Sequence, residues 1–187
     1  MLQPMFFRGV FFLLTLSCPM LSFSQQEGQG FCEGLKRGNY FPLDIKSKKI
    51  VWYETYYYER LIGTKIFNDK TYFEFEQEWK EGQKDYLFLR EEDDVVFQYE
   101  ECCQEETVRF GNKIRKESAW VSISGEFEYK LKSDKQKLKT PYCEYKDLMV
   151  IEAKYKNNIF EFYYQRGLGY IGAKENGKLI SFIVPEI

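Results

Sequence analysis

The sequence of 187 residues contains no histidine, and it has only 5 prolines and 13 glycines. Without an imidazole group, serine triads, cysteine–histidine dyads and histidine-bound zinc sites are excluded. The net charge is −2 at pH 7, so the chain lacks the basic excess that nucleic-acid binding requires. The chain is instead rich in aromatic residues, with 17 Phe, 15 Tyr and 3 Trp. This composition excludes a disordered chain and indicates one globular domain.

The first 24 residues have the layout of a secretory signal peptide. One cation, Arg8, precedes an apolar run over residues 10–16, and the small residues Ser22 and Ser24 follow. The run is shorter than the ~20 residues that a membrane-spanning helix needs. We therefore expect cleavage after Ser24, export to the periplasm or the extracellular space, and no transmembrane span in the mature protein.

Export changes the interpretation of the cysteines. Cys18 lies within the leader, and Thr15 stands where a lipoprotein signal has leucine, so we do not expect a lipid anchor there. Four cysteines remain in an oxidising compartment, which favours disulfides, with free thiols as the alternative: Cys32, Cys102, Cys103 and Cys143. Because a bridge between adjacent cysteines strains the peptide, we expect one of the adjacent pair to bond Cys32 and the other to bond Cys143. The sequence contains no Cys-x-x-Cys spacing, so the cysteines do not indicate a metal or redox site.

We predict that residues 25–49 form an irregular, glycine-containing segment, which we call the N-terminal lead. We predict that residues 50–187 form a single β domain. Apolar and polar residues alternate with a period of two, most clearly over 119–131, which we predict as one strand, and again over 72–79 and 149–155. A helix would distribute the intervening glutamates around its surface, so this period predicts sheet with one dry face and one wet face.

Turn signals separate the predicted strands and define the fold class. Asn176 and Gly177 suit a tight type I′ turn, and short loops at 81–83 and 157–158 fit hairpins, which make neighbouring strands antiparallel. Residues 133–139 read as a solvated basic loop. We therefore predict an all-β fold, an antiparallel meander of about 8–11 strands that forms a curved sheet, half-barrel or barrel.

Aromatic residues provide the candidate binding surface. Within a predicted strand over 50–60, both faces carry rings, so one set exceeds what a core needs. Exposed rings on a sheet stack on sugars or accept lipids and peptides. The alternative is a central strand that is covered on both faces. The candidate ligand-binding residues are Trp52, Tyr56, Tyr58 and Tyr163.

Other motifs have simpler structural interpretations. Gly167 and Gly169 fit a bulge better than a phosphate-binding turn, since no helix pattern follows them. The acidic run 91–94 fits a hairpin loop better than a calcium site. Glutamates that could pair for glycoside hydrolysis fit the wet face of a sheet: Glu74, Glu76, Glu78, Glu126 and Glu128. We predict no catalytic residue, no metal and no cofactor.

Three segments carry a family resemblance: a Tyr-rich stretch over 52–58, the stretch 86–92, and the Tyr-Tyr-x-x-Gly-x-Gly-aromatic pattern over 163–170. With the leader, they resemble secreted or periplasmic β-rich proteins of Bacteroidetes-type bacteria. The last pattern is also similar to half-barrel lipoprotein-carrier domains. The resemblance implies a β fold and a compartment outside the cytosol, and it implies no catalytic residue.

These observations together predict a non-enzymatic exported β protein. Its partner would be an apolar or amphiphilic ligand such as a lipid or glycan, or another envelope protein. Two alternatives are a structural module that assembles through the sheet edges and a hydrolase that uses carboxylates.

The leader generates the first prediction. Protein recovered from an exporting bacterial host should begin at Gln25, because signal peptidase cuts after the small residue Ser24. Intact-mass measurement and N-terminal sequencing check this. A Leu13→Arg variant, which interrupts the apolar run, should retain the uncut precursor. Recovery of uncut wild-type chain from the cytosol would contradict the assignment.

Overall fold

The computed structural model describes residues 30–111 and 119–185. These residues form twelve strands and no helix, so the all-β prediction is confirmed. None of them belongs to a helix of the length and hydropathy that a bilayer crossing requires. The predicted leader, including Cys18, lies outside the described residues. The strands are β1 (Ser47–Trp52), β2 (Thr55–Phe67), β3 (Lys70–Trp79), β4 (Lys84–Glu92), β5 (Val95–Glu100), β6 (Glu105–Gly111), β7 (Ala119–Val121), β8 (Glu128–Lys139), β9 (Glu144–Tyr155), β10 (Asn158–Gln165), β11 (Gly169–Glu175) and β12 (Lys178–Val184).

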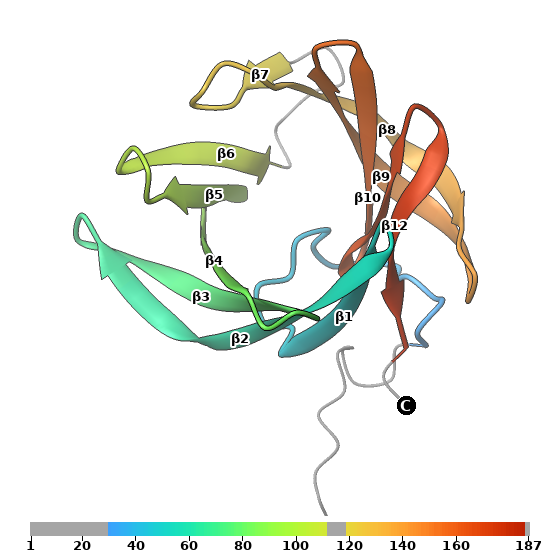
Figure 1. Cartoon of the computed structure of the whole chain (residues 1–187), viewed down its shortest axis with the longest axis horizontal. Helices are drawn as coiled ribbons and strands as arrows, with labels where there is room; N and C mark the ends of the chain where they lie inside the picture. The colour runs from blue at the N-terminus through green and yellow to red at the C-terminus, as the bar shows by residue number, and fades with distance from the viewer. Residues whose placement is uncertain (1–29, 112–118, 186–187) are drawn as a thin grey trace, which may run out of the picture.

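All strands belong to one antiparallel sheet that curls into a nearly closed barrel (Figure 1). The order is β6-β5-β4-β3-β2-β1-β12-β11-β10-β9-β8-β7, so every neighbouring pair except β1 and β12 is consecutive in sequence. β1 pairs with β2 on one side and with β12 on the other. The two halves of the chain therefore meet at β1, and β6 and β7 are the edges of the sheet within the described residues.

Local backbone chemistry produces the hairpins. Asn176 and Gly177 have φ values of 49° and 82°, which confirms the predicted tight turn between β11 and β12. The acidic run 91–94 includes the end of β4 and the hairpin turn that follows it, where Asp93 and Asp94 adopt positive φ and stay exposed. These residue types accept the left-handed backbone region at low cost.

Two predicted long strands each contain a turn, which corrects the expected count. The chain turns back after Trp52, so the segment 50–60 is divided between β1 and β2. The segment 119–131 is likewise divided between β7 and β8, because Gly125 adopts φ 70° and the Ser122 amide donates to the Phe127 carbonyl at 2.9 Å. Alternating side chains continue through both turns, which hides them from a period-two analysis.

The prediction of a solvated loop over 133–139 is wrong. These residues form the end of β8, which pairs with β9 through several register shifts. Leu138 is completely buried, whereas Lys135, Lys137 and Lys139 are exposed. The lysines dominate the composition, but the single apolar residue decides how this irregular strand packs.

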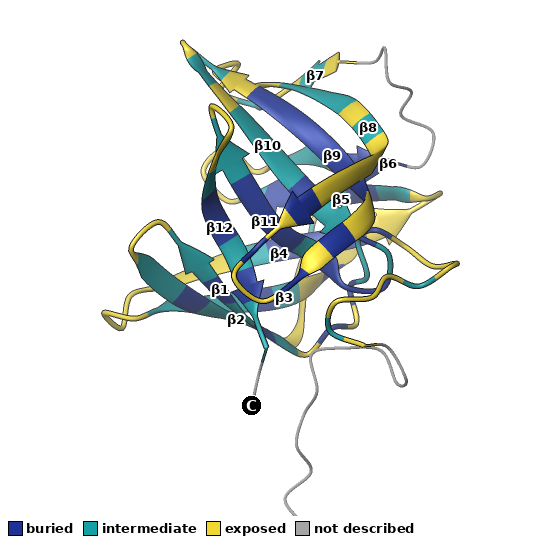
Figure 2. Ribbon diagram, turned by 90° about the vertical axis from the view of Figure 1, so that its right-hand side faces the viewer, coloured by how far each residue is buried: buried dark blue, intermediate teal, exposed yellow. Residues whose placement is uncertain are grey.

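The expected single wet face also fails for β9, where both faces are buried (Figure 2). Met149 and Ile151 pack with Phe110 on the inner face. The alternate residues Leu148 and Val150 pack with Leu138 and with the N-terminal segment, whose Phe31 contacts the ring of Tyr145. Apolar side chains of β8, β9 and the N-terminal segment therefore cover the outer face of β9.

The part of the N-terminal lead that the structure describes is attached to the barrel (Figure 1, blue). Residues 30–46 contain neither helix nor strand, and Tyr40, Leu43 and Ile45 are buried. The Leu35 amide donates to the Arg166 carbonyl at 3.1 Å, and the Gly167 amide donates to the Asn39 carbonyl at 3.0 Å. Tyr40 and Leu43 of this segment thus pack against inner residues of the sheet, whereas Phe31 lies on the outer face.

The expected disulfide pairing is wrong. Cys32 is bonded to Cys143, with 5.5 Å between their Cα atoms, and Cys102 is bonded to its neighbour Cys103. The lead runs to the turn between β8 and β9, which holds Cys143. Cys102 and Cys103 lie in the turn between β5 and β6, in the other half of the sheet. The path of the lead, which local sequence does not reveal, decides the pairing.

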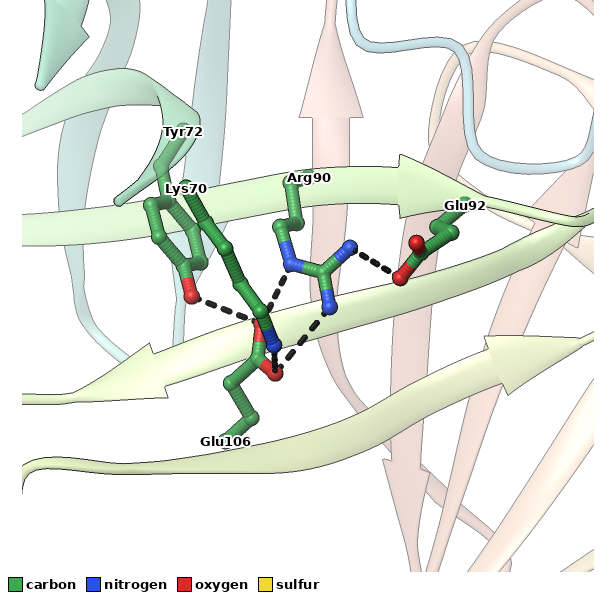
Figure 3. A network of polar contacts seen from close by, with 5 residues as sticks. All are labelled: Lys70, Tyr72, Arg90, Glu92 and Glu106. Atoms are coloured by element: carbon green, nitrogen blue, oxygen red, sulfur yellow. Dashed lines mark hydrogen bonds and ion pairs between the residues drawn. The ribbon is translucent and has the colours of Figure 1, made fainter. Parts of the chain in front are cut away.

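An ionic network joins β3, β4 and β6 on the face opposite the interior (Figure 3). Glu106 accepts hydrogen bonds from Lys70 and Tyr72, each at 2.6 Å, and from two nitrogens of the Arg90 guanidinium. Arg90 also donates to Glu92 at 2.7 Å. The hydrogen bonds, led by that from Arg90, lower the pKa of Glu106 to about 2. The network fastens the edge strand β6 to the strands before it.

The long-range disulfide generates a stability prediction. A Cys32→Ala/Cys143→Ala variant should lose about 2–5 kcal/mol of unfolding free energy, because the bond closes a long loop in the unfolded chain. Urea unfolding measures the loss. The matched control, Cys102→Ala/Cys103→Ala, opens a bond between adjacent residues and should lose much less. A larger loss in the control would contradict the structural role of the Cys32–Cys143 bond.

The network generates a pH prediction. Glu106→Gln should lower the unfolding free energy by about 1.5–3 kcal/mol at pH 7, because charge-assisted hydrogen bonds are lost. The pKa of Glu106 is lowered on folding from 4.5 to about 2, so its contribution is present above pH 4.5 and is lost as the pH falls toward 2. Urea unfolding at pH 7 and pH 3 should therefore show a smaller difference at pH 3.

Glu92→Gln is the control for this measurement, since the Glu92 side chain is 61% exposed and contacts the same arginine. It should change the unfolding free energy by less than about 1 kcal/mol. An equal loss for Glu106→Gln at both pH values would show that its charge is not responsible.

Candidate functional site

A cavity of about 440 Å³ lies inside the barrel. Its wall comes from β1 to β4 on one side, from β6, β10 and β11 on the others, and from the N-terminal lead. Most lining side chains are apolar, among them Phe41, Leu43, Trp52, Phe75, Trp79 and Leu87. Four lining side chains are charged or carry an amide: Lys48, Glu59, Gln77 and Arg109.

Three of these polar side chains form a row across the wall. Lys48 in β1 is the register partner of Glu59 in β2, and Glu59 is the partner of Gln77 in β3. The Gln77 amide donates to the Glu59 carboxylate at 2.8 Å. Tyr57 and Trp79 form the next inward row, with ring centroids 4.8 Å apart. The polar row therefore crosses an otherwise apolar interior.

Lys48 carries the most unusual charge in this row. Its residue is 9% exposed, and it has no ion-pair partner within 4.0 Å among the described residues. Burial lowers the pKa of Lys48, and the negative charge of Glu59 only partly opposes this effect. Its Nζ atom lies against the turn between β10 and β11, since a Cβ atom on Gly169 would be 3.0 Å from it.

Tyrosine hydroxyls supply the other polar groups of the interior. Burial raises the pKa of Tyr57 and Tyr170 well above the ordinary value, so both hydroxyls stay protonated near neutral pH. The Tyr170 hydroxyl is buried without a partner in hydrogen-bonding geometry within the described part of the chain. The adjacent Ser181 hydroxyl donates instead to the Val51 carbonyl at 2.7 Å. A buried donor of this kind is suited to a bound acceptor.

Arg109 borders the interior because of an irregularity in the sheet, although the residue itself is exposed to solvent. The register between β5 and β6 shifts at Val96 and Phe97, and Arg109 lines both the large cavity and a neighbouring one of about 90 Å³. Its positive charge opposes the effect of burial on the pKa of Tyr164. Glu100 lines only the smaller cavity.

The four predicted ligand-binding residues lie in three different environments. Trp52 lines the cavity. Tyr56 and Tyr58 lie on the opposite face of the sheet, where the Lys49 ammonium is 4.2 Å and 5.5 Å from their ring centroids. Tyr163 is buried and donates to Glu161 at 2.8 Å. The structure therefore does not bring the four residues together.

The polar row was absent from the sequence-based candidates. Lys48 falls within the predicted irregular lead, but it shares the parity of Ile50 and Trp52 and so belongs to the inward face of β1. Glu59 likewise shares the parity of Tyr57 and Leu61, which are apolar or aromatic residues of β2. A charged residue at an apolar position of an alternating strand is the signal that could have identified both.

The glutamates considered for glycoside hydrolysis do not line this cavity. Glu76 and Glu78 lie on the outer face, where Glu76 pairs with Lys84 at 2.9 Å. Glu59 is the one carboxylate among the described residues that line the cavity. The described part of the chain also contains no cluster of three or more residues able to hold a metal ion.

Comparison with protein families, with curated proteins and with solved structures finds no match to this chain. The resemblance to secreted β-rich proteins and to half-barrel carrier domains therefore stays a prediction. The same holds for the compartment in which the protein works.

Proposed function

We propose that this protein binds a small apolar or amphiphilic molecule inside its barrel. The observation that carries the proposal is the cavity of about 440 Å³, whose aromatic and aliphatic wall is crossed by one polar row. Small-molecule sites commonly have volumes of ~300–1,000 Å³ and combine an apolar lining with a few polar groups. This cavity has both properties.

The scaffold supports a preformed site. The cavity wall is drawn from the continuous antiparallel sheet and from a lead that is held by backbone hydrogen bonds and by the Cys32–Cys143 bond. A ligand would therefore meet side chains already ordered by the fold, which reduces the entropic cost of binding. The disulfides and the predicted leader support a site of action outside the cytosol.

The cavity is a better candidate than the outer aromatic residues. Tyr56 and Tyr58 have cationic side chains over their rings, with Lys49 above both and Arg60 5.0 Å from the Tyr58 ring centroid. A docking partner would have to displace these side chains. The inner aromatic residues, including Trp52 and Trp79, surround open volume instead.

A cavity-filling variant tests the proposal. Wild-type protein should bind 12-carbon amphiphiles, and Leu87→Trp should reduce the affinity at least about tenfold, because the larger side chain occupies the lumen. Trp52 and Trp79 line the cavity, so tryptophan fluorescence can follow binding in the wild type. Native mass spectrometry can confirm the complex and its stoichiometry.

The control variant is Tyr86→Trp, on the same strand. Tyr86 precedes Leu87, points to the opposite face and is 48% exposed, so the added indole stays outside the cavity. This variant should bind as the wild type does. If the wild type binds none of the 12-carbon amphiphiles, or if both variants bind like the wild type, the lumen is not the binding site.

A further inference from the structure

The charges that line the cavity do not balance. Lys48 and Arg109 contribute two positive charges, and Glu59 contributes one negative charge that already accepts the hydrogen bond from Gln77. The remaining titratable groups of the lining are tyrosines, and burial keeps the hydroxyls of Tyr57, Tyr164 and Tyr170 protonated. Among the described residues, the lining therefore has an excess of one positive charge, and Lys48 is its buried cation, since Arg109 is exposed to solvent.

Lys48 is the part of this excess that is hardest to explain by folding alone. A buried ammonium without an ion-pair partner is costly, and a methylene-rich apolar side chain would fill the same place without that cost. The opposite carboxylate of Glu59 is within the same row but does not approach to 4.0 Å. The positive charge is therefore suited to a group that the folded chain does not itself provide.

A second unsatisfied group borders the same cavity. The Tyr170 hydroxyl is buried next to Ser181 but makes no well-formed hydrogen bond among the described residues, and Tyr170 lines the same cavity as Lys48. An acceptor with a negative charge would satisfy the hydroxyl and the ammonium together. Charge-assisted hydrogen bonds of this kind are about twice as strong as neutral ones.

We propose, on the basis of the proposed function, that the ligand is an apolar molecule with one anionic carboxylate, which pairs with Lys48 while its apolar part lies against the aromatic wall. One unpaired buried cation matches a monoanion, whereas a phosphate monoester would bring nearly two negative charges. Lys48 and Tyr170 would bind the carboxylate, and Arg109 would add a favourable field from the sheet edge.

Three probes of equal chain length test the inference on wild-type protein: dodecanoate, 1-dodecanol and dodecylammonium. At pH 7 and concentrations below micelle formation, dodecanoate should bind at least about tenfold more tightly than the alcohol, because it gains a charge-assisted contact. Dodecylammonium should bind most weakly. Equal affinity for the acid and the alcohol, or a preference for the ammonium, would overturn the inference while leaving the proposed function intact.

Two substitutions locate the responsible charge. Lys48→Met should weaken dodecanoate binding about tenfold or more and change dodecanol binding by less than about twofold. Glu59→Gln, in the next strand of the same row, removes the negative charge opposite Lys48 and should therefore strengthen dodecanoate binding. Circular dichroism and thermal melting confirm folding of both variants, and the wild-type comparison does not depend on them. Equal weakening of both probes in Lys48→Met would overturn the assignment to Lys48.

Discussion

The pairing of β1 with β12 is the contact on which the rest of the structure depends. All other strand pairs are hairpin neighbours, whereas this pair joins segments about as far apart as Val51 and Ser181, whose side-chain contact spans 130 positions. Closing so long a loop costs conformational entropy. The backbone hydrogen bonds between β1 and β12 and the burial of the inner faces must offset this cost. Without this pairing the two halves would be separate curved meanders, and their inner faces would not enclose a common volume.

The enclosed volume explains why polar groups on the inner face deserve a functional interpretation. An alternating strand normally directs its charged residues toward water, and Lys48 and Glu59 do the reverse. Among the described residues, Glu59 accepts a hydrogen bond from Gln77, whereas Lys48 has no ion-pair partner and the Tyr170 hydroxyl makes no well-formed hydrogen bond. Stability alone favours apolar side chains at such positions. The unsatisfied groups are thus the physical basis for a ligand of opposite charge.

Two peripheral devices hold this interior in shape. The N-terminal lead packs Leu43 into the cluster around Phe75, and the Cys32–Cys143 bond ties the lead to the other half of the sheet. On the outer face, Glu106 binds groups from β3 and β4 and so secures the edge strand β6. Arg109, in the same edge strand, depends on this attachment for its place at the cavity. Outer ionic contacts and the inner site are therefore linked through β6.

The sequence by itself determined the fold class, because period-two alternation and turn chemistry act between residues that are close in the chain. Asn176 and Gly177 favour their turn through their own backbone preferences, and the absence of histidine restricts the chemistry in any fold. The tertiary structure alone decided that Cys32 bonds Cys143, that residues 133–139 extend a strand, and that Lys48 faces the lumen with Tyr170. Each of these depends on contacts between distant segments. Alternation in the sequence predicts that a strand has two different faces. Only the closure of the sheet decides which residues each face contacts.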